Sequence, residues 1–218
     1  MNAPTQQIQQ TIEQASLDRA INELRKDLLD DAGPRISTMR NYRFAILTYD
    51  PEKEFDLRQR IRNLSDELTG KGWNVLSISL QKLLLDRLKA EDPRVLESII
   101  RMEHRLHEKD PERALTHLKN KLTRYVEGPD GIARDVIERI SQFADDYPNE
   151  TNRTLFFLGR TGALYPFFRS SALLKHIDGK TRNLPVVVLY PGERRERQAL
   201  SFMKELSTDR DYRPRVYS

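Results

Sequence analysis

The chain has 218 residues, no cysteine, and a formal net charge of +4 from 37 basic and 33 acidic side chains. This length predicts one domain with room for an insertion, and 38% hydrophobic residues are enough for a folded core. Without thiols, disulfide bonds and thiolate catalysis are excluded. No apolar stretch reaches the length of a membrane span, and the first residues lack the layout of a secretion signal. We therefore expect a cytoplasmic protein.

The positive charge is concentrated in the last third of the chain. Residues 151–218 contain 13 basic and 6 acidic side chains, whereas residues 1–150 contain 24 and 27. Such an excess favours phosphate or an acidic protein surface as a partner. It is sparser than the dense Lys and Arg stripe of a dedicated duplex-DNA binder.

The first part of the chain predicts a helical segment followed by a strand, helix, strand unit. Ile21, Leu24 and Leu28 recur at helical spacing, so residues 1–33 are predicted to form an amphipathic helix or a broken pair, ended by Gly33-Pro34. The next predicted elements are a buried strand at 44–47, a helix at 57–68 and a second strand at 73–78.

Residues 80–148 show only helical periodicity. Helices are predicted over 80–89, 93–109, 111–126 and 131–147. Pro93 and Pro111 fall where the first turn of a helix tolerates proline. Because no strand signal interrupts this region, it is predicted to be a helical insertion between the second and third strands.

The remaining residues predict a second crossover unit. Thr154–Leu158 and Pro185–Tyr190 are apolar without alternation, as expected of parallel strands covered on both faces. Between them, residues 162–169 are predicted to open an aromatic crossover helix. A short helix at 197–206 and an edge strand at 212–217 are expected to follow.

The predicted fold class is therefore α/β. One domain over residues 1–218 would contain an open, mostly parallel sheet of about five strands, covered by helices in a Rossmann-like three-layer arrangement. Residues 1–33 would be its N-terminal helical segment and residues 80–148 its helical insertion.

Candidate binding residues follow the predicted strands, because ligands of open parallel sheets bind beyond the carboxyl ends of the strands. Asp50, Arg160, Arg194 and Arg195 leave those ends, and Arg169 could join them from the crossover helix. Guanidinium groups suit phosphate or carboxylate, on a small ligand or on a partner. The alternative interpretation is that these are ordinary solvated loop arginines.

No catalytic, cofactor or metal site is predicted. Gly179-Lys180-Thr181 lacks the earlier glycine and the preceding strand of a phosphate-binding loop. His104, His107 and His117 could cluster on the insertion, but their spacing does not enforce three converging ligands, so solvated helix residues are the preferred interpretation. Ser170 lies within a predicted helix and not in the Gly-x-Ser-x-Gly turn of a hydrolase.

Several segments together resemble the BrxB family, the small component of BREX bacteriophage-defence systems. They are Tyr42–Pro51, Tyr165–Ser170, Pro185–Gly192 and Asp211–Arg213. The resemblance implies a cytoplasmic bacterial protein without established enzymatic activity, in a multi-protein system that blocks replication of phage DNA. It also implies association with PglZ, the alkaline-phosphatase-like component of the system.

The hypothesis that combines these observations is a non-catalytic adaptor, without cofactor, that docks PglZ and other BREX components. The alternatives are a module that binds nucleic acid through Arg160, Arg169, Arg194 and Arg195, or a nucleotide-responsive module that uses the same strand ends.

Overall fold

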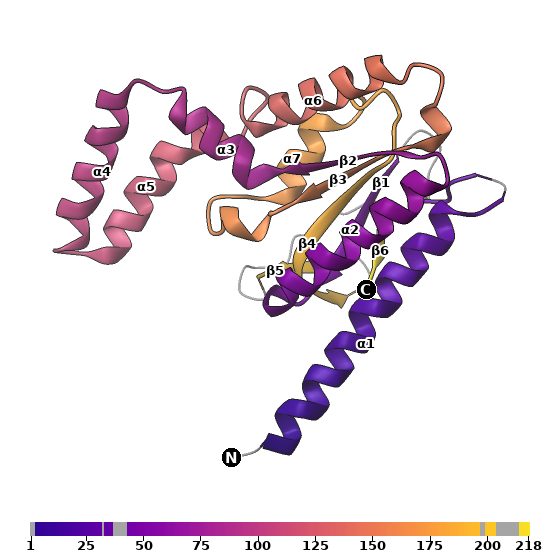
Figure 1. The fold of residues 1–218 in the computed structure, drawn as a ribbon. Coiled ribbons are helices and arrows are strands. Elements are labelled where there is room, and N and C mark those ends of the chain that lie inside the picture. Colours follow the sequence, from indigo (N-terminus) through magenta and orange to yellow (C-terminus); the bar gives the residue numbers. More distant parts are fainter. Residues whose placement is uncertain (1–2, 32, 37–42, 197–198, 204–213) are drawn as a thin grey trace.

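The computed structural model describes residues 3–31, 33–36, 43–196, 199–203 and 214–218, with the side chains of these residues except 3–15, 194–196 and 199–200 (Figure 1). Its strands are β1 (Phe44–Tyr49), β2 (Asn74–Ser79), β3 (Thr154–Gly159), β4 (Val186–Glu196), β5 (Ala199–Phe202) and β6 (Arg215–Tyr217). Its α-helices are α1 (Ala3–Leu28), α2 (Glu54–Gly70), α3 (Leu80–Lys89), α4 (Pro93–His107), α5 (Pro111–Val126), α6 (Ile132–Asp146) and α7 (Ser170–Ile177). Short 3-10 helices occupy η1 (Pro51–Lys53), η2 (Thr151–Arg153) and η3 (Gly162–Leu164).

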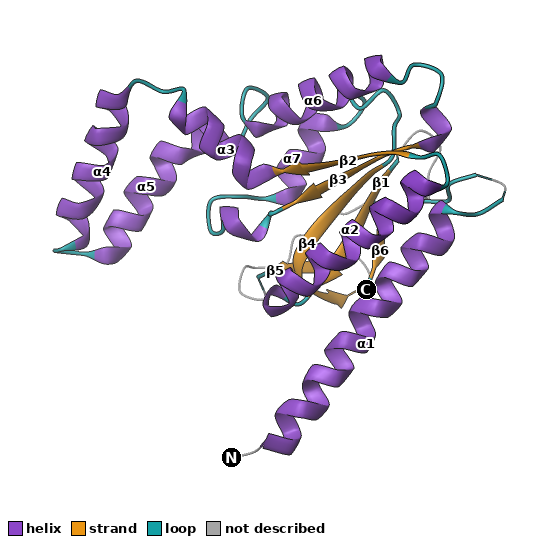
Figure 2. Ribbon diagram, viewed as in Figure 1, coloured by secondary structure: helices purple, strands orange, loops and turns teal. Residues whose placement is uncertain are grey.

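The centre of the molecule is an open parallel sheet in the order β2-β3-β4-β1-β6 (Figure 2). The pairs β2/β3, β3/β4, β1/β4 and β1/β6 are all parallel. β5 lies outside this order and pairs with the far end of β4 in the antiparallel direction. The predicted α/β class with a mostly parallel sheet of about five strands is confirmed.

Helices cover both faces of the sheet, which explains why the strands are apolar without alternation. In β1, Phe44 and Ile46 point to a core that includes α6 and α7. Ala45 and Leu47 point to the opposite core, which is closed by α1 and α2. The residues of β1 and nearly all of β3 are therefore buried, so a polar residue in these runs would be buried, whereas the edge strand β2 is only partly covered.

The helices between β2 and β3 are those predicted for the insertion, and local capping sets their starts. Side-chain oxygens of Ser79, Asp92 and Asp110 accept hydrogen bonds from backbone N–H groups in the first turns of α3, α4 and α5. Proline occupies the first turn of α4 and α5, where its missing N–H costs nothing. The observed bounds of α3 and α5 coincide with the predicted ones, and α4 ends at His107.

The N-terminal segment forms one helix, α1, that ends at Leu28, several residues before Gly33-Pro34. Its C-terminal half is attached to the edge strand β6 through Asp27. The Tyr217 hydroxyl donates to Asp27 Oδ2 at 2.8 Å, and Arg215 Nη2 lies 2.5 Å from the same oxygen. Burial and this hydrogen bond raise the pKa of Tyr217. The predicted edge strand is confirmed over 215–217, while residues 212–213 lie outside the described part of the chain.

The predicted aromatic crossover helix at 162–169 is wrong in its position. η3 covers only Gly162–Leu164, and the α-helix begins at Ser170. Pro166 explains the delay, because it has no N–H to donate and it disfavours helical backbone in the residue before it. Tyr165 has the expected extended conformation, with φ −65° and ψ 137°, and its bond to Pro166 is cis.

Two predictions beyond Tyr190 are also wrong. Arg194 and Arg195, predicted to lie beyond the carboxyl end of their strand, belong to β4, and residues 199–202 of the expected helix 197–206 form β5. Gly192 pairs with Phe202 and Glu193 with Ser201. Burial of Ser201 and Phe202 stabilises the strand over the helix, since tertiary packing overrides weak local propensity. Residues 197–198 and 204–206 lie outside the described residues.

An ion pair connects α3 to α6. The Arg87 guanidinium donates to both carboxylate oxygens of Asp135 and, through Nη2, to the Gly131 carbonyl at 2.7 Å. The two charged side chains are only 16% and 20% exposed. Two-point bonding between a guanidinium and a carboxylate fixes geometry as well as charge, so this contact orients the helices of the insertion.

We predict that Asp135→Ala lowers the free energy of unfolding by about 1.5–3 kcal/mol, because it leaves a half-buried guanidinium without its charged partner. Asp130→Ala is the matched control, since Asp130 is 88% exposed and lies 3.9 Å from Arg134. The control should change stability by less than about 0.5 kcal/mol. Urea unfolding followed by circular dichroism measures both, and equal losses in the two variants would contradict the role given to Arg87.

Candidate functional site at the carboxyl edge of the sheet

The carboxyl ends of β1, β2 and β3 lie at one edge of the sheet, where parallel α/β proteins bind their ligands. A polar cluster occupies this edge. We call it the edge cluster, and it consists of Tyr49, Glu54, Gln81, Arg160 and Thr161. Only Arg160 was among the residues predicted from the sequence.

Arg160 is the centre of the edge cluster. Its Nε and Nη2 atoms donate to Gln81 Oε1 at 3.0 and 2.8 Å, and its Nη1 atom donates to Glu54 Oε1 at 3.3 Å. It thereby joins the end of β3 to the first turns of α2 and α3. Its φ of 61° is left-handed, which is uncommon for a residue with a side chain. The surrounding contacts hold this backbone, as expected for a position with a specific task.

Tyr49 and Glu54 close the cluster on the side of β1 and α2. The buried Tyr49 hydroxyl donates to Glu54 Oε2, so one carboxylate binds both the phenol and the guanidinium of Arg160. Burial, and then the hydrogen bond to Glu54, raise the pKa of Tyr49 well above its usual range. The phenol therefore stays protonated at neutral pH and acts as a hydrogen-bond donor, not as a base or a nucleophile.

Thr161 completes the edge cluster from the neighbouring position. Its buried hydroxyl donates to the Leu189 carbonyl of β4 at 2.6 Å, which holds the turn after β3 against the next strand. A sequence signal for the missed members does exist, because Glu54 and Gln81 each lie within five residues of a strand end. Their helical context made them look like ordinary solvated side chains.

Neither Asp50 nor Arg169 is a member of the edge cluster. The Asp50 carboxylate accepts a hydrogen bond from the Glu52 N–H at 3.0 Å and caps η1, which is a local structural role. Arg169 precedes α7, is exposed, and forms no ion pair with any described residue. Arg194 and Arg195 belong to β4 by their backbone, but their side chains lie outside the described part of the chain.

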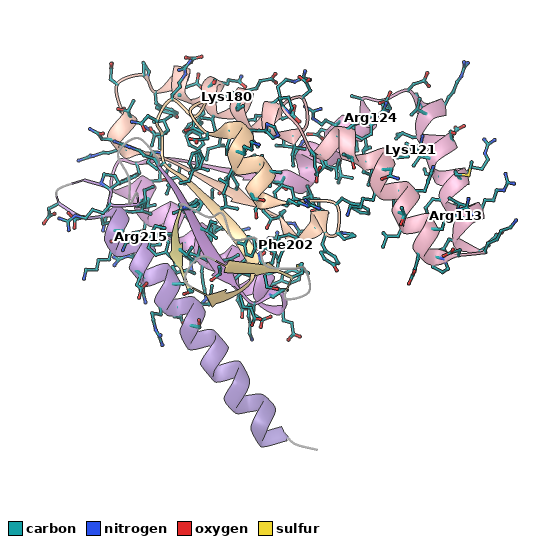
Figure 3. The ribbon with its side chains drawn as sticks, turned by 180° about the vertical axis from the view of Figure 1, so that it is seen from behind. Arg113, Lys121, Arg124, Lys180, Phe202 and Arg215 are labelled. Atoms are coloured by element: carbon teal, nitrogen blue, oxygen red, sulfur yellow. The ribbon has the colours of Figure 1, made fainter. Side chains whose placement is uncertain are left out.

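Three aromatic rings surround Phe202 beside the edge cluster. The rings of Tyr190, Phe168 and Tyr165 lie 5.2, 6.1 and 6.3 Å from that of Phe202 between centroids. Figure 3 shows Phe202 in the body of the molecule, far from the labelled residues of α5. Two of the sequence segments that carry the resemblance, around Tyr165 and around Tyr190, therefore meet in one aromatic cluster.

The weaker motifs have no converging geometry in the structure. The Gly179-Lys180-Thr181 segment follows the C-terminal end of α7 and does not open a helix, so its backbone does not form a phosphate cradle. Among the described residues, no group of three His, Asp or Glu side chains could hold a metal ion, and His104, His107 and His117 are no exception. Within the same residues, no helix combines the length and apolar composition that crossing a bilayer requires.

Fold and site together define a three-layer α/β protein whose strand ends are closed by internal hydrogen bonds and whose insertion is entirely helical in its described elements. A family model described as BREX protein BrxB matches residues 76–216, which is more than half of the chain. The chain belongs to the BrxB family, and thus to the components of BREX phage-defence systems. The match runs from within β2 to within β6, and it omits residues 42–51, one of the segments that carry the resemblance. No curated protein and no solved structure matches the chain.

The backbone at Gly192, in the Tyr190-Pro191-Gly192 segment, leaves no room for a side chain. Gly192 has a φ of +154°, and a Cβ atom there would lie 2.1 Å from the Ser201 carbonyl oxygen. We expect Gly192→Ala to lower the free energy of unfolding by about 1–3 kcal/mol, because the β4/β5 pair must separate to admit the methyl group. Gly70→Ala is the control, since a methyl group added there would have nothing within 4 Å of it. Thermal unfolding compares the two, and a Gly192→Ala variant as stable as the control would be inconsistent with this hairpin.

The buried phenol of Tyr49 predicts a loss of stability at alkaline pH. The folded-state pKa of Tyr49 is raised above the unfolded value of about 10. The protonated phenol therefore stabilises the fold fully below that pH, and this stabilisation is lost as the pH rises above it. Tyr49→Phe should reduce the slope of unfolding free energy against pH by up to about 1.4 kcal/mol per pH unit. Urea unfolding between about pH 9 and pH 11 measures the slope. Tyr147→Phe is the control for loss of a hydroxyl, because this residue is 37% exposed. Identical slopes in the wild type and both variants would contradict the role given to Tyr49.

Proposed function

We propose that this BrxB-family protein is a non-catalytic adaptor of a cytoplasmic BREX system and that it docks the alkaline-phosphatase-like PglZ component. The family match supports a place in the defence system. The role as an adaptor and the choice of partner are our proposal, based on the geometry of the carboxyl edge and on the resemblance of the sequence segments to this family.

The observation that carries the proposal is the mutual pairing within the edge cluster. At the place where a parallel sheet would hold a ligand, Arg160 is bound by Gln81 and Glu54, and Glu54 is also bound by Tyr49. These groups satisfy one another, so a phosphate that displaced them would leave a half-buried carboxylate without its charged partner. The arrangement thus favours a rigid scaffold over a substrate pocket.

The charge distribution supports docking to another protein. The last third of the chain has 13 basic and 6 acidic side chains, and Arg169 is exposed beside the carboxyl edge without an ion pair among the described residues. An excess of this sort attracts an acidic protein surface and accelerates encounter with it. It is moderate in density, which fits a protein partner better than nonspecific duplex DNA.

Co-purification with the PglZ-like protein of the same locus tests the proposal. We expect a stoichiometric complex on size-exclusion chromatography, retained from about 0.1 M to 1 M salt because a specific interface also buries apolar surface. The tagged PglZ-like protein without this chain, and this chain with an unrelated tagged protein, are the controls. No complex at any salt concentration would overturn docking.

Two further outcomes would contradict the adaptor role and indicate another function. Tight binding of the isolated chain to DNA, with affinity that falls steeply with salt and decreases in Arg169→Ala, would identify a nucleic-acid-binding module instead. Turnover of a substrate that persists through purification and disappears on a single substitution would show that the protein is an enzyme.

A further inference from the structure

The two-helix hairpin of α4 and α5 projects from the body of the molecule (Figure 1). α4 packs mainly against α5, while α5 also contacts α3 and α6. Only Ile99 of α4 is buried, whereas Ile100 and Met102 of α4 and Leu115 of α5 are large apolar side chains that stay exposed. A helix covered by a single neighbour keeps part of its surface available for another chain.

An open groove runs between these two helices, with a volume of about 550 Å³. Its lining combines apolar and basic side chains. α4 contributes Arg94, Val95, Ser98, Ile99 and Met102, and α5 contributes His117, Asn120, Lys121 and Arg124. Figure 3 shows Lys121 and Arg124 on α5, well away from Phe202 and the edge of the sheet.

The groove has an unbalanced positive charge. None of the described residues that line it is acidic. Arg94 and Lys121 are exposed, and neither forms an ion pair within the described part of the chain. Arg124 is partly neutralised, because its Nη2 atom lies 2.7 Å from Glu91 Oε2 and its guanidinium lies 4.6 Å from the centre of the Tyr125 ring. At least two cations are therefore free to bind an anionic group.

His117 supplies a second, independent observation. Its Nδ1 atom is buried and has no hydrogen-bond partner among the described residues. A buried polar atom without a partner costs about 1–3 kcal/mol. Asn120 and Ser98 beside it can both donate and accept hydrogen bonds. A peptide segment that enters the groove can form hydrogen bonds with Ser98 and Asn120, and its carboxylates are attracted by Arg94 and Lys121.

We propose that this groove binds a short acidic segment of a partner protein that inserts an apolar side chain between α4 and α5. The inference rests on the proposed adaptor function. It names a docking surface on the insertion, separate from Arg169 and the basic last third of the chain, and the chemistry of the partner. The basic side chains select carboxylates, and Val95, Ile99 and Met102 select an apolar side chain. A phosphodiester backbone would satisfy the cations but leave the apolar part of the groove unfilled, so the lining favours a peptide over a nucleic acid.

Fluorescence anisotropy with the full chain tests the groove directly. The probes are three labelled peptides: one with Asp and Glu around Leu and Phe, one in which Ser replaces Leu and Phe, and one in which Lys replaces the acidic residues. We expect the acidic apolar peptide to bind about tenfold more tightly than either of the others. Equal binding of the acidic apolar and the Ser peptides would overturn the proposal, and so would preferential binding of a single-stranded oligonucleotide.

Paired charge reversals locate the binding surface. Arg94→Glu combined with Lys121→Glu should weaken binding of the acidic apolar peptide about tenfold or more. Lys109→Glu combined with Lys119→Glu makes the same change in net charge on the same hairpin, outside the groove lining. This control should bind as the wild type does, and circular dichroism checks that both variants remain folded. Equal weakening in both would mean nonspecific attraction and would refute the groove.

The peptide assay and the co-purification experiment fail independently. If the PglZ-like protein binds the wild type and the Arg94→Glu, Lys121→Glu variant equally well, and no peptide prefers the groove, the adaptor function stands and the groove inference is wrong. If the acidic apolar peptide binds the groove but the PglZ-like protein does not bind the chain, the groove inference stands and the choice of partner is wrong.

Discussion

Burial of both faces of the parallel sheet is the constraint on which the rest of the structure depends. Alternate residues of β1, β3 and β4 enter two separate apolar cores, one closed by α1 and α2 and the other by α3, α5, α6 and α7. A parallel sheet requires a crossover between its strands, and these crossovers supply the helices that cover it. With both faces occupied, the strand ends and the projecting hairpin are two places among the described residues that can meet a ligand or a partner.

At the strand ends the polar side chains of the edge cluster form hydrogen bonds with one another and with the backbone. Arg160 binds Glu54 and Gln81, Tyr49 shares Glu54, and Thr161 binds the backbone of β4. The rings of Tyr165 and Tyr190, which come from two separate segments of the chain, pack against Phe202. Two of the segments that carry the family resemblance, Tyr165–Ser170 and Pro185–Gly192, thus have a structural explanation in packing and backbone geometry, with Gly192 needed for the close approach to Ser201.

The helical insertion has a different character. The bidentate contact of Arg87 with Asp135 and Gly131 fixes α3 against α6 on the body. α4 and α5 then extend away from the sheet with a groove that is basic, partly apolar and free of acidic lining among the described residues. Such a division suits the proposed adaptor role, since one part is rigid and another presents a surface to a partner.

The sequence by itself determined the element order, the parallel sheet and the helical insertion, because uninterrupted apolar runs, helical periodicity and capping prolines are local signals. It also placed Arg160 at a strand end. Only the tertiary structure decided that Glu54 and Gln81 would bind it, since these residues are 106 and 79 positions away in the chain. The same holds for β5, which the local pattern predicted as helix: pairing with β4 and burial of Phe202 outweighed a weak local preference. The groove between α4 and α5 could not be predicted from the sequence either. Arg and Lys residues on a helix give the same sequence pattern whether they face solvent or an apolar groove.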